Sequence, residues 1–371
     1  MTASILEHFG KLEDFRIERG KLHALPDLVV LTICAVVAGA DGWEAIAQFG
    51  RYKLDWLRQF IPLKNGAPSA DCLAYVLQRV SPEGFRSCFQ EWTDALVQAT
   101  GGQVVAIDGK TSRGSRDRRG GRGPLHLVSA WAAHNRLVLG QEATDEKSNE
   151  ITAIPKLLSI LVLKGCIVTI DAMGCQRAIA EQIVEQGGDY VLALKDNQPT
   201  LHEAAKDFFA TAEAADFAGV TYDAVAETDK GHGRVETRRY FITEHLETLP
   251  HRDEWRGLRS IGMAVRETWT GGRHTEERRY FIASIAADAQ SFATAVRQHW
   301  GIENRLHWRL DVVFNEDAST IRKGNGPVIL ATVRHLALNL FERSGSSSGL
   351  AAKRRRAAWD DDYRANVVFA T

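Results

Sequence analysis

The stretch that decides the fold is QVVAIDGK, from Gln103 to Lys110. Its Val and Ile residues form a short apolar run that is typical of a buried strand, and this run ends at Asp108. An ionised Asp at the end of a buried strand is costly unless it is paired with another group or bound to a cation. The stretch therefore predicts a buried strand with an Asp at or near its end, which alone would be unremarkable because a turn or a cap often follows a strand.

The same pattern returns in CIVTIDAM, residues 166–173, where Asp171 follows an apolar run. The segments between and after the two runs predict further strands at 126–134, 136–144 and 190–195, and helices at 149–163 and 177–188. Three strands, a helix, a strand, a helix and a strand is the order of the ribonuclease H-like fold. The first and fourth strands are neighbours in that fold, so we expect Asp108 and Asp171 to share a metal site.

A third acid lies in HWGIENRLHWRLDVVFNEDAS, residues 299–319. In a helix, His299, Glu303 and His307 would form one stripe, because they are spaced at i, i+4 and i+8. An apolar stripe lies beside it and consists of Ile302, Leu306, Leu310 and Val313. A core helix with a polar edge, a zinc site and a carboxylate for a hard cation are the three alternatives.

The spacing argues against zinc, because two full helical turns are too long for three ligands of one tetrahedral ion. The two strand-end Asp residues favour the hard cation, with Glu303 as the third carboxylate. Glu316 and Asp317 fit turn positions better than ligand positions, and we expect Trp300 and Trp308 to pack in a core or an interface rather than to stack on bases.

The chain divides into two expected domains. Residues 1–97 predict a small helical domain, in which Ser81 and Pro82 mark a helix start. DNA-end binding by this domain is a hypothesis, since no specific helix-turn-helix signal is present. Residues 98–371 predict an α/β domain with a ribonuclease H-like catalytic core. Alternating apolar and polar residues indicate that a β-rich insertion interrupts this core at about 196–290.

Bulk composition gives little support to DNA binding, since the net charge of the 371 residues is −1 and the pI is near 6.9. Local charge differs, because the Gly-rich loop GKTSRGSRDRRGGRG, residues 109–123, is strongly basic. Its backbone N–H groups and cations could bind phosphates, although a solvated loop fits the same composition. The five scattered Cys residues indicate neither a disulfide framework nor structural zinc. The longest uncharged apolar run, 28–40, is too short to span a membrane, so we expect a cytoplasmic protein without a membrane partner.

Several motifs together resemble those of a known family. IDGKT, KSNEI, TIDAMGCQ, YVLALKDNQ and HWGIENRLHWRLDVVFNED occur in this order, and the likeness runs from about residue 8 to the C-terminus. The chain resembles DDE transposases of the ISAs family of insertion sequences, which includes the H-repeat-associated proteins of Rhs elements. The resemblance implies that Asp108, Asp171 and Glu303 are the catalytic acids and the metal ligands.

One departure concerns a Tyr, Arg, Glu, Lys signature around the third acid of related transposases. Val296, His299 and Leu310 stand at the Tyr, Arg and Lys places here. This leaves the three acids intact but puts hairpin-type processing of DNA ends in doubt.

The implied cofactor is Mg²⁺ or Mn²⁺, with two ions held by the three acids. The implied partners are double-stranded DNA, as element ends and as target, and further copies of the chain in a homo-oligomer on DNA. Water or a DNA 3′-OH would attack the phosphodiester, so cutting and joining would be one displacement with two nucleophiles. The expected DNA-contacting residues are Lys110, Arg113, Arg116, Arg118, Arg119, Lys147, Lys195, His299 and His307, and Glu150 and Asn197 are expected to line the same groove.

Two alternatives stay open at this point. The chain could be a ribonuclease H-like nuclease that cuts without joining, or a domesticated DNA-binding protein without activity.

Overall fold

The computed structural model describes residues 4–96, 103–144, 150–231 and 233–369. Its first part is helical, as the sequence predicts, and comprises α1 (Ile5–Phe9), η1 (Glu18–Gly20), α2 (Leu25–Val37), α3 (Trp43–Tyr52), α4 (Leu54–Leu57), α5 (Ala70–Leu77) and α6 (Pro82–Asp94). Ser81 caps α6, because its side chain accepts a hydrogen bond from the Gly84 N–H at 3.1 Å. The predicted domain boundary at residue 97 lies outside the described residues.

One nine-stranded sheet then follows, in the order β3-β2-β1-β4-β5-β9-β8-β7-β6. Its first five strands are β1 (Val104–Ser112), β2 (Leu125–Ala132), β3 (Leu137–Thr144), β4 (Ile167–Ile170) and β5 (Asp189–Leu194). The strands β1, β2 and β3 are antiparallel, whereas β4 pairs in parallel with both β1 and β5. The helices α7 (Glu150–Leu158) and α8 (Arg177–Glu185) lie between them in the chain. The predicted order of elements is therefore confirmed.

Helix α7 is shorter than the predicted helix at 149–163, whose first residue is not among those described. It ends at Leu158, and the amides of Ile160 and Leu161 then bond to Leu157 O and Leu158 O, three residues back. This tighter turn ends the helix. The following Leu161 and Leu163 are still buried, so their apolar pattern alone predicts a helix that continues.

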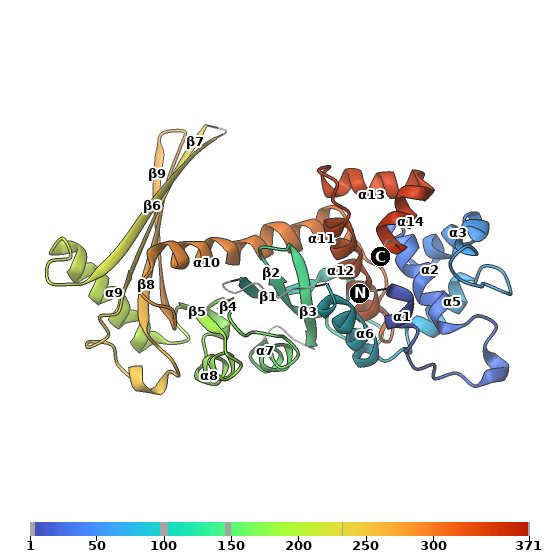
Figure 1. Cartoon of the computed structure of the whole chain (residues 1–371), viewed down its shortest axis with the longest axis horizontal. Coiled ribbons are helices and arrows are strands. Elements are labelled where there is room, and N and C mark those ends of the chain that lie inside the picture. The colour runs from blue at the N-terminus through green and yellow to red at the C-terminus, as the bar shows by residue number, and fades with distance from the viewer. Residues whose placement is uncertain (1–3, 97–102, 145–149, 232, 370–371) are drawn as a thin grey trace.

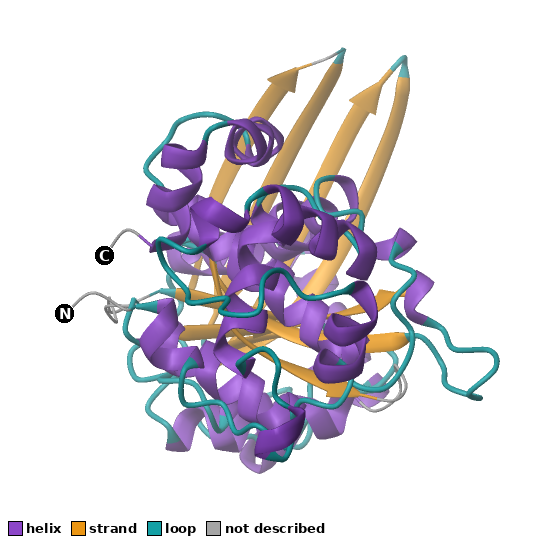
Figure 2. Ribbon diagram, turned by 90° about the vertical axis from the view of Figure 1, so that its right-hand side faces the viewer, coloured by secondary structure: helices purple, strands orange, loops and turns teal. Residues whose placement is uncertain are grey.

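The segment predicted as a β-rich insertion at about 196–290 does consist largely of antiparallel strands. It contains a helix of 16 residues, α9 (Pro199–Ala214), and its strands β6 (Tyr222–Gly231), β7 (Arg234–Thr243), β8 (Ser260–Thr270) and β9 (Arg273–Ala283) extend the main sheet. The strand β9 pairs with β5, with Leu192 opposite Ile282. A sheet edge offers unpaired N–H and C=O groups, and the inserted strands satisfy those of β5. The four strands project beyond the helices as a long arm (Figure 2).

The two faces of the sheet are covered by different helices (Figure 1). The long α10 (Ala289–Ile302) crosses one face, where Phe292 and Val296 pack against residues of β5, β7 and β9. The helices α7, α8 and α9 cover the other face and share a core with Val105 and Ile107 of β1. Both sides of β1 are thus fixed by packing.

The helix α10 continues through η6 (Glu303–His307), one turn of π-helix, into α11 (Trp308–Val312). The short η7 (Glu316–Ala318) and the helices α12 (Gly326–Arg343), α13 (Leu350–Trp359) and α14 (Asp361–Phe369) complete the chain. Ile302, Leu306 and Leu310 are buried as predicted. However, they join a core formed mainly by the N-terminal helices with α12, α13 and α14, so the stripe packs only partly on the sheet.

None of the helices in the described part of the chain combines the length and hydropathy that a membrane span requires.

Candidate active site

The two predicted strand-end acids lie beside each other, although β1 continues past Asp108 to Ser112 and pairs with β2 along that length. Ile107 and Ile170 are paired in the parallel ladder of β1 and β4, and Asp108 and Asp171 are the residues that follow them. Asp108 Oδ1 accepts a hydrogen bond from the Gly109 N–H at 2.9 Å, and Asp171 Oδ1 accepts one from the Met173 N–H at 3.1 Å. The predicted neighbourhood of the two carboxylates is thus confirmed.

The electrostatics of this site are those of acids crowded together. Burial, the charge of Asp171 and, to a smaller extent, the charge of Glu303 raise the pKa of Asp108 to about 7. Burial and the charge of Glu150 raise the pKa of Asp171, against the opposing effect of Lys195. Without a bound cation, Asp108 is therefore only partly ionised near neutral pH.

Glu303 lies on η6, and its side chain is exposed. A π-turn widens the helix by one residue per turn, so the predicted stripe of His299, Glu303 and His307 does not follow α-helical spacing here. His307 Nδ1 lies 3.5 Å from Asp108 Oδ2, and His299 Nδ1 lies 3.1 Å from Thr169 Oγ1 on β4. These contacts hold the helix against β1 and β4, with Glu303 between them.

The two histidines carry no positive charge at neutral pH. Burial lowers the pKa of His299 to about 4, and burial with the charge of Lys110 lowers the pKa of His307 to about 3. Neither is hydrogen-bonded to Glu303 within the described residues. Neutral imidazoles attract phosphate weakly, so the structure favours a packing role for both over the expected phosphate contact.

Lys110, an expected phosphate contact, is instead held by acids. Its Nζ lies 2.7 Å from Asp311, 3.2 Å from Glu316 and 3.3 Å from Asp317. The predicted turn position of Glu316 and Asp317 is confirmed, because both lie in η7. Their ion pairs with Lys110 were not predicted, and they join β1 to the segment that follows α11.

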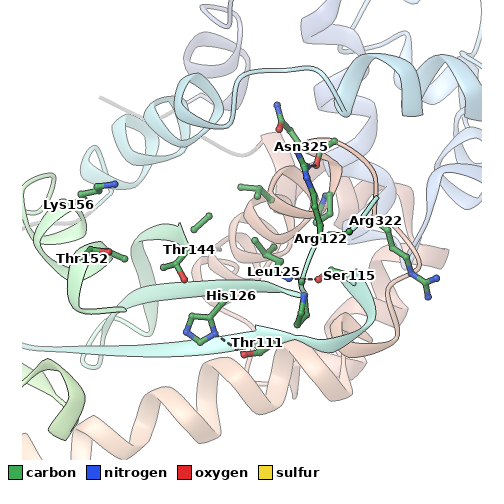
Figure 3. A pocket seen from close by; sticks show the side chains of 18 residues that line it. Thr111, Ser115, Arg122, Leu125, His126, Thr144, Thr152, Lys156, Arg322 and Asn325 are labelled. Atoms are coloured by element: carbon green, nitrogen blue, oxygen red, sulfur yellow. Dashed lines mark hydrogen bonds between the residues drawn. The ribbon is translucent and has the colours of Figure 1, made fainter. Parts of the chain in front are cut away.

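Glu150 was expected to line a DNA groove, but it is 4% exposed. Its Oε1 lies 2.6 Å from Nε2 of the equally buried His126. His126 Nδ1 in turn lies 2.8 Å from Thr111 Oγ1, and a dashed line joins the two side chains in Figure 3. This polar pair was missed by the sequence reasoning, and only the charge of a Glu at a helix start could have signalled it.

The basic loop keeps most of its cations exposed. The side chains of Arg113, Arg116, Arg118 and Arg119 are exposed, and only Arg113 is ion-paired within the described residues, at 3.6 Å to Asp317. The loop adopts a defined turn, because Asp117 accepts hydrogen bonds from Arg119 N, Gly120 N and Arg122 N. The interpretation as a phosphate-binding loop is compatible with this geometry.

A cavity of about 870 Å³ lies next to this loop (Figure 3). Arg122, Arg322 and Lys156 line it, and none of the lining residues in the described part of the chain is acidic. Arg122 and Arg322 donate to the main-chain oxygens of Gly324 and Gly114, which orients the guanidinium groups without neutralising them. These cations were not singled out from the sequence.

The other expected DNA contacts have mixed outcomes. Lys195 is exposed at the end of β5, close enough to Asp171 to affect its pKa. Asn197 donates to Ala172 O and Cys175 O, so it fixes the turn after Asp171 rather than facing a groove. Lys147 lies outside the described residues.

The two tryptophans of the third motif differ in exposure. Trp300 is covered by the guanidinium groups of Arg266 and Arg279, whose centres lie 5.2 and 4.7 Å from the centre of its ring. This agrees with the predicted packing role of Trp300. Trp308 is 58% exposed, so it does not pack in the core of this chain.

The residues present fit a divalent cation by their chemistry. Carboxylate oxygens are the preferred ligands of Mg²⁺, and here burial and the neighbouring acids raise the pKa of Asp108 and of Asp171. Within 4–96, 103–144, 150–231 and 233–369, however, no three His, Cys, Asp or Glu side chains form a ready-made ligand cluster. The side chains of Glu303 and the two Asp residues would therefore have to move closer together to bind a cation.

Comparison with known proteins decides the family. The model of the transposase DDE domain matches residues 99–340, and that of the DDE_Tnp_1-associated domain matches residues 6–93. The chain belongs to the DDE transposase family. It is 42% identical to the "H repeat-associated putative transposase YhhI" of Escherichia coli K12, over 98% of this chain and 97% of that protein. It is 40% identical to the "Putative transposase YncI" of Escherichia coli O157:H7, over 98% and 94%.

The transposase is also similar to shorter proteins. It is 41% identical to the "Inactive transposase YbfQ" of Escherichia coli K12, over 20% of this chain and 89% of that protein. Among solved structures, a cryo-EM structure of a piggyBac transposase synaptic complex with hairpin DNA matches 97% of this chain and 78% of that chain. Its identity of 11% and TM-score of 0.44 are too low to carry an argument.

Proposed function

We propose that this transposase cuts DNA at the ends of an insertion sequence by metal-dependent phosphodiester hydrolysis and joins the 3′ ends to target DNA. The observation that carries the proposal is the placement of Asp108 and Asp171 after paired residues of adjacent parallel strands, with Glu303 on the helix that crosses them. The strand order β3-β2-β1-β4-β5, with α7 and α8 in between, supports a ribonuclease H-like core.

The chain's own residues would act as follows. Asp108, Asp171 and Glu303 would hold two Mg²⁺ or Mn²⁺ ions. When bound, such ions activate the attacking oxygen and stabilise the departing 3′ oxygen. The Gly109 N–H orients the Asp108 carboxylate, and His299 and His307 hold the helix of Glu303 against the two strands. Water or a DNA 3′-OH serves as nucleophile in the same site.

DNA would approach across the basic loop. Arg116, Arg118 and Arg119 are exposed and have no ion pair within the described residues, and Lys195 is exposed beside Asp171. The cavity with Arg122, Arg322 and Lys156 continues this basic surface. We place the phosphodiester backbone of duplex DNA on this surface, with a homo-oligomer bringing two DNA ends together.

The test uses duplexes that carry the DNA flanking the reading frame. Inverted repeats there should be nicked in Mg²⁺ or Mn²⁺, and pre-cut ends should become joined to a plasmid. Nicking without joining would indicate the alternative nuclease. Failure of both reactions, with DNA binding retained, would indicate an inactive DNA-binding protein and contradict the proposal.

A further inference from the structure

A buried polar pair lies behind the first catalytic acid. Glu150 is the first residue of α7, and His126 is the second residue of β2. They are 4% and 2% exposed, and their contact between Oε1 and Nε2 measures 2.6 Å. A neutral imidazole satisfies both of its contacts if Nδ1 accepts from the Thr111 hydroxyl and Nε2 donates to Glu150. In that state the pair keeps one negative charge.

The pair lies directly against the backbone at Gly109. A Cβ atom at this glycine would stand 2.3 Å from Glu150 Oε1 and 2.6 Å from His126 Nε2. Real Cβ atoms do not approach other atoms so closely, so only glycine admits the pair here. The same residue donates its N–H to Asp108 Oδ1 at 2.9 Å. The pair therefore supports the peptide that orients the Asp108 carboxylate.

The charge of Glu150 acts in the same place. It raises the pKa of Asp108, and among the neighbouring charges it has the largest effect on the pKa of Asp171. A glutamine at this position could accept the same hydrogen bond from His126 without repelling two acids. If Glu150 had only a structural role, its charge would be unfavourable, because it repels Asp108 and Asp171. Beside a bound divalent cation the same charge is favourable.

We infer that Glu150 is a positioning residue of the cation site, which holds the Asp108–Gly109 backbone through His126 and strengthens cation binding at Asp108 and Asp171 through its charge. This inference rests on the proposed function, because it requires that the site binds Mg²⁺ or Mn²⁺. Glu150 lies outside the three acids of the catalytic set and outside the basic surface.

The test is Glu150→Gln in the full chain, which keeps the shape and an acceptor and removes the charge. Mn²⁺ affinity is measured by calorimetry, and the melting temperature is measured in EDTA and in excess Mn²⁺. The expected result is a Mn²⁺ affinity about 10- to 100-fold weaker, with a melting temperature in EDTA that is unchanged or higher. Cleavage of element-end DNA should then need more Mn²⁺.

The matched control is Glu342→Gln, which removes a mostly buried carboxylate that is paired with Arg309 at the end of α12. It should lower the melting temperature equally in both buffers and leave Mn²⁺ affinity unchanged. If Glu150→Gln does not fold, His126→Gln serves instead, since it keeps the Glu150 charge and a donor. Its Mn²⁺ affinity should stay close to that of wild type.

The outcomes separate this inference from the proposed function. The inference alone is overturned if wild type and Glu150→Gln have equal Mn²⁺ affinity. It is also overturned if His126→Gln loses as much Mn²⁺ affinity as is expected for Glu150→Gln. If wild type itself binds no Mn²⁺, both the inference and the proposed function fall.

Discussion

Two groups of acids lie close to β1, and only one of them is ion-paired with a lysine in the described part of the chain. In the first group, Asp311, Glu316 and Asp317 surround the ammonium group of Lys110 at 2.7 to 3.3 Å. Their charge is offset by cations of the chain itself, because Arg334 also pairs with Glu316 and Arg113 with Asp317. This group joins two segments that are about 200 residues apart, and its role is structural.

The second group lies two residues earlier on β1 and has no such partner. Asp108, Asp171, Glu150 and Glu303 form no ion pair with a Lys or Arg among the described residues. The pKa of Asp108 therefore rises to about 7, since burial and its acidic neighbours disfavour the ionised form. The comparison teaches that unbalanced charge, rather than the number of acids, distinguishes a site for an external cation.

Removing an acid from the unbalanced group should have the largest effect. Asp108→Asn or Asp171→Asn should reduce cleavage of element-end DNA at least a hundredfold, about 2.7 kcal/mol in barrier, while DNA binding persists. Gel-based cleavage and fluorescence anisotropy measure the two quantities. Cleavage above about a hundredth of the wild-type rate would remove that residue from the catalytic role.

Removing the cation from the balanced group should cost stability instead. Lys110→Met leaves Asp311 without a cation partner among the described residues, and Glu316 and Asp317 with only Arg334 and Arg113. It should lower the free energy of unfolding by about 3 kcal/mol, equally in EDTA and in Mg²⁺. Urea unfolding measures this. Lys156→Met is the control, because Lys156 is exposed and has no ion pair in the described part of the chain, and it should change stability by less than about 0.5 kcal/mol. A similarly small change for Lys110→Met would show that its cation is free to contact DNA.

Glu303→Gln should reveal the metal dependence directly. Its melting temperature in EDTA should match or exceed that of wild type, since one of several repelling acids is gone. The gain in melting temperature with Mg²⁺ should shrink, because a ligand that binds only the folded state stabilises it by mass action. An equal loss of stability in both buffers would contradict the assignment of Glu303 as a ligand.

The pH dependence should be smaller but specific. Asp108 has a raised folded-state pKa, so its contribution to stability is fully present below about pH 4 and is lost as the pH rises to about 7. In EDTA, the unfolding free energy of wild type should therefore fall relative to that of Asp108→Asn over this range. Excess Mg²⁺ should remove the difference. Parallel pH profiles of the two proteins in EDTA would show that Asp108 is not perturbed.

The smallest expected effect concerns cations that lack acidic partners. Neutralising Arg116, Arg118 and Arg119 should flatten the salt dependence of DNA binding, by about 0.9 in the log–log slope for each DNA phosphate that is no longer neutralised. The control neutralises three exposed cations elsewhere, namely Lys164, Lys206 and Arg256. Equal slopes for both variants would leave the basic loop as a solvated connection.

The order of the strands and helices from β1 to β5 could be predicted because the strands are short apolar runs. The parallel pairing of β1 with β4 then brought Asp108 and Asp171 together as expected. The attachment of β9 to β5 could not be predicted, since alternation along a strand does not reveal which edge it will join. The π-turn was missed because a helical stripe read from sequence assumes 3.6 residues per turn.

The partners of individual side chains were the least predictable part of the site. From the sequence, Lys110 is predicted to contact phosphate. Its acidic partners lie about 200 residues further along the chain, so the sequence around Lys110 does not reveal them. From the sequence, Glu150 is predicted to be an exposed residue at a helix start, because no neighbouring residue in the sequence indicates its contact with His126. Both assignments depend on long-range contacts, and such contacts arise only when the sheet has formed.

The shared core of the first and last helices has a consequence for synthesis on the ribosome. Leu31 and Phe89, near the start of the chain, belong to the same core as Leu336 and Phe341, near its end. The N-terminal helices therefore cannot bury their apolar faces completely until the last helices have left the exit tunnel. A copy that ends before α12 would carry all three acids and still expose that surface to chaperones and proteases, so the intact reading frame governs how much folded protein accumulates.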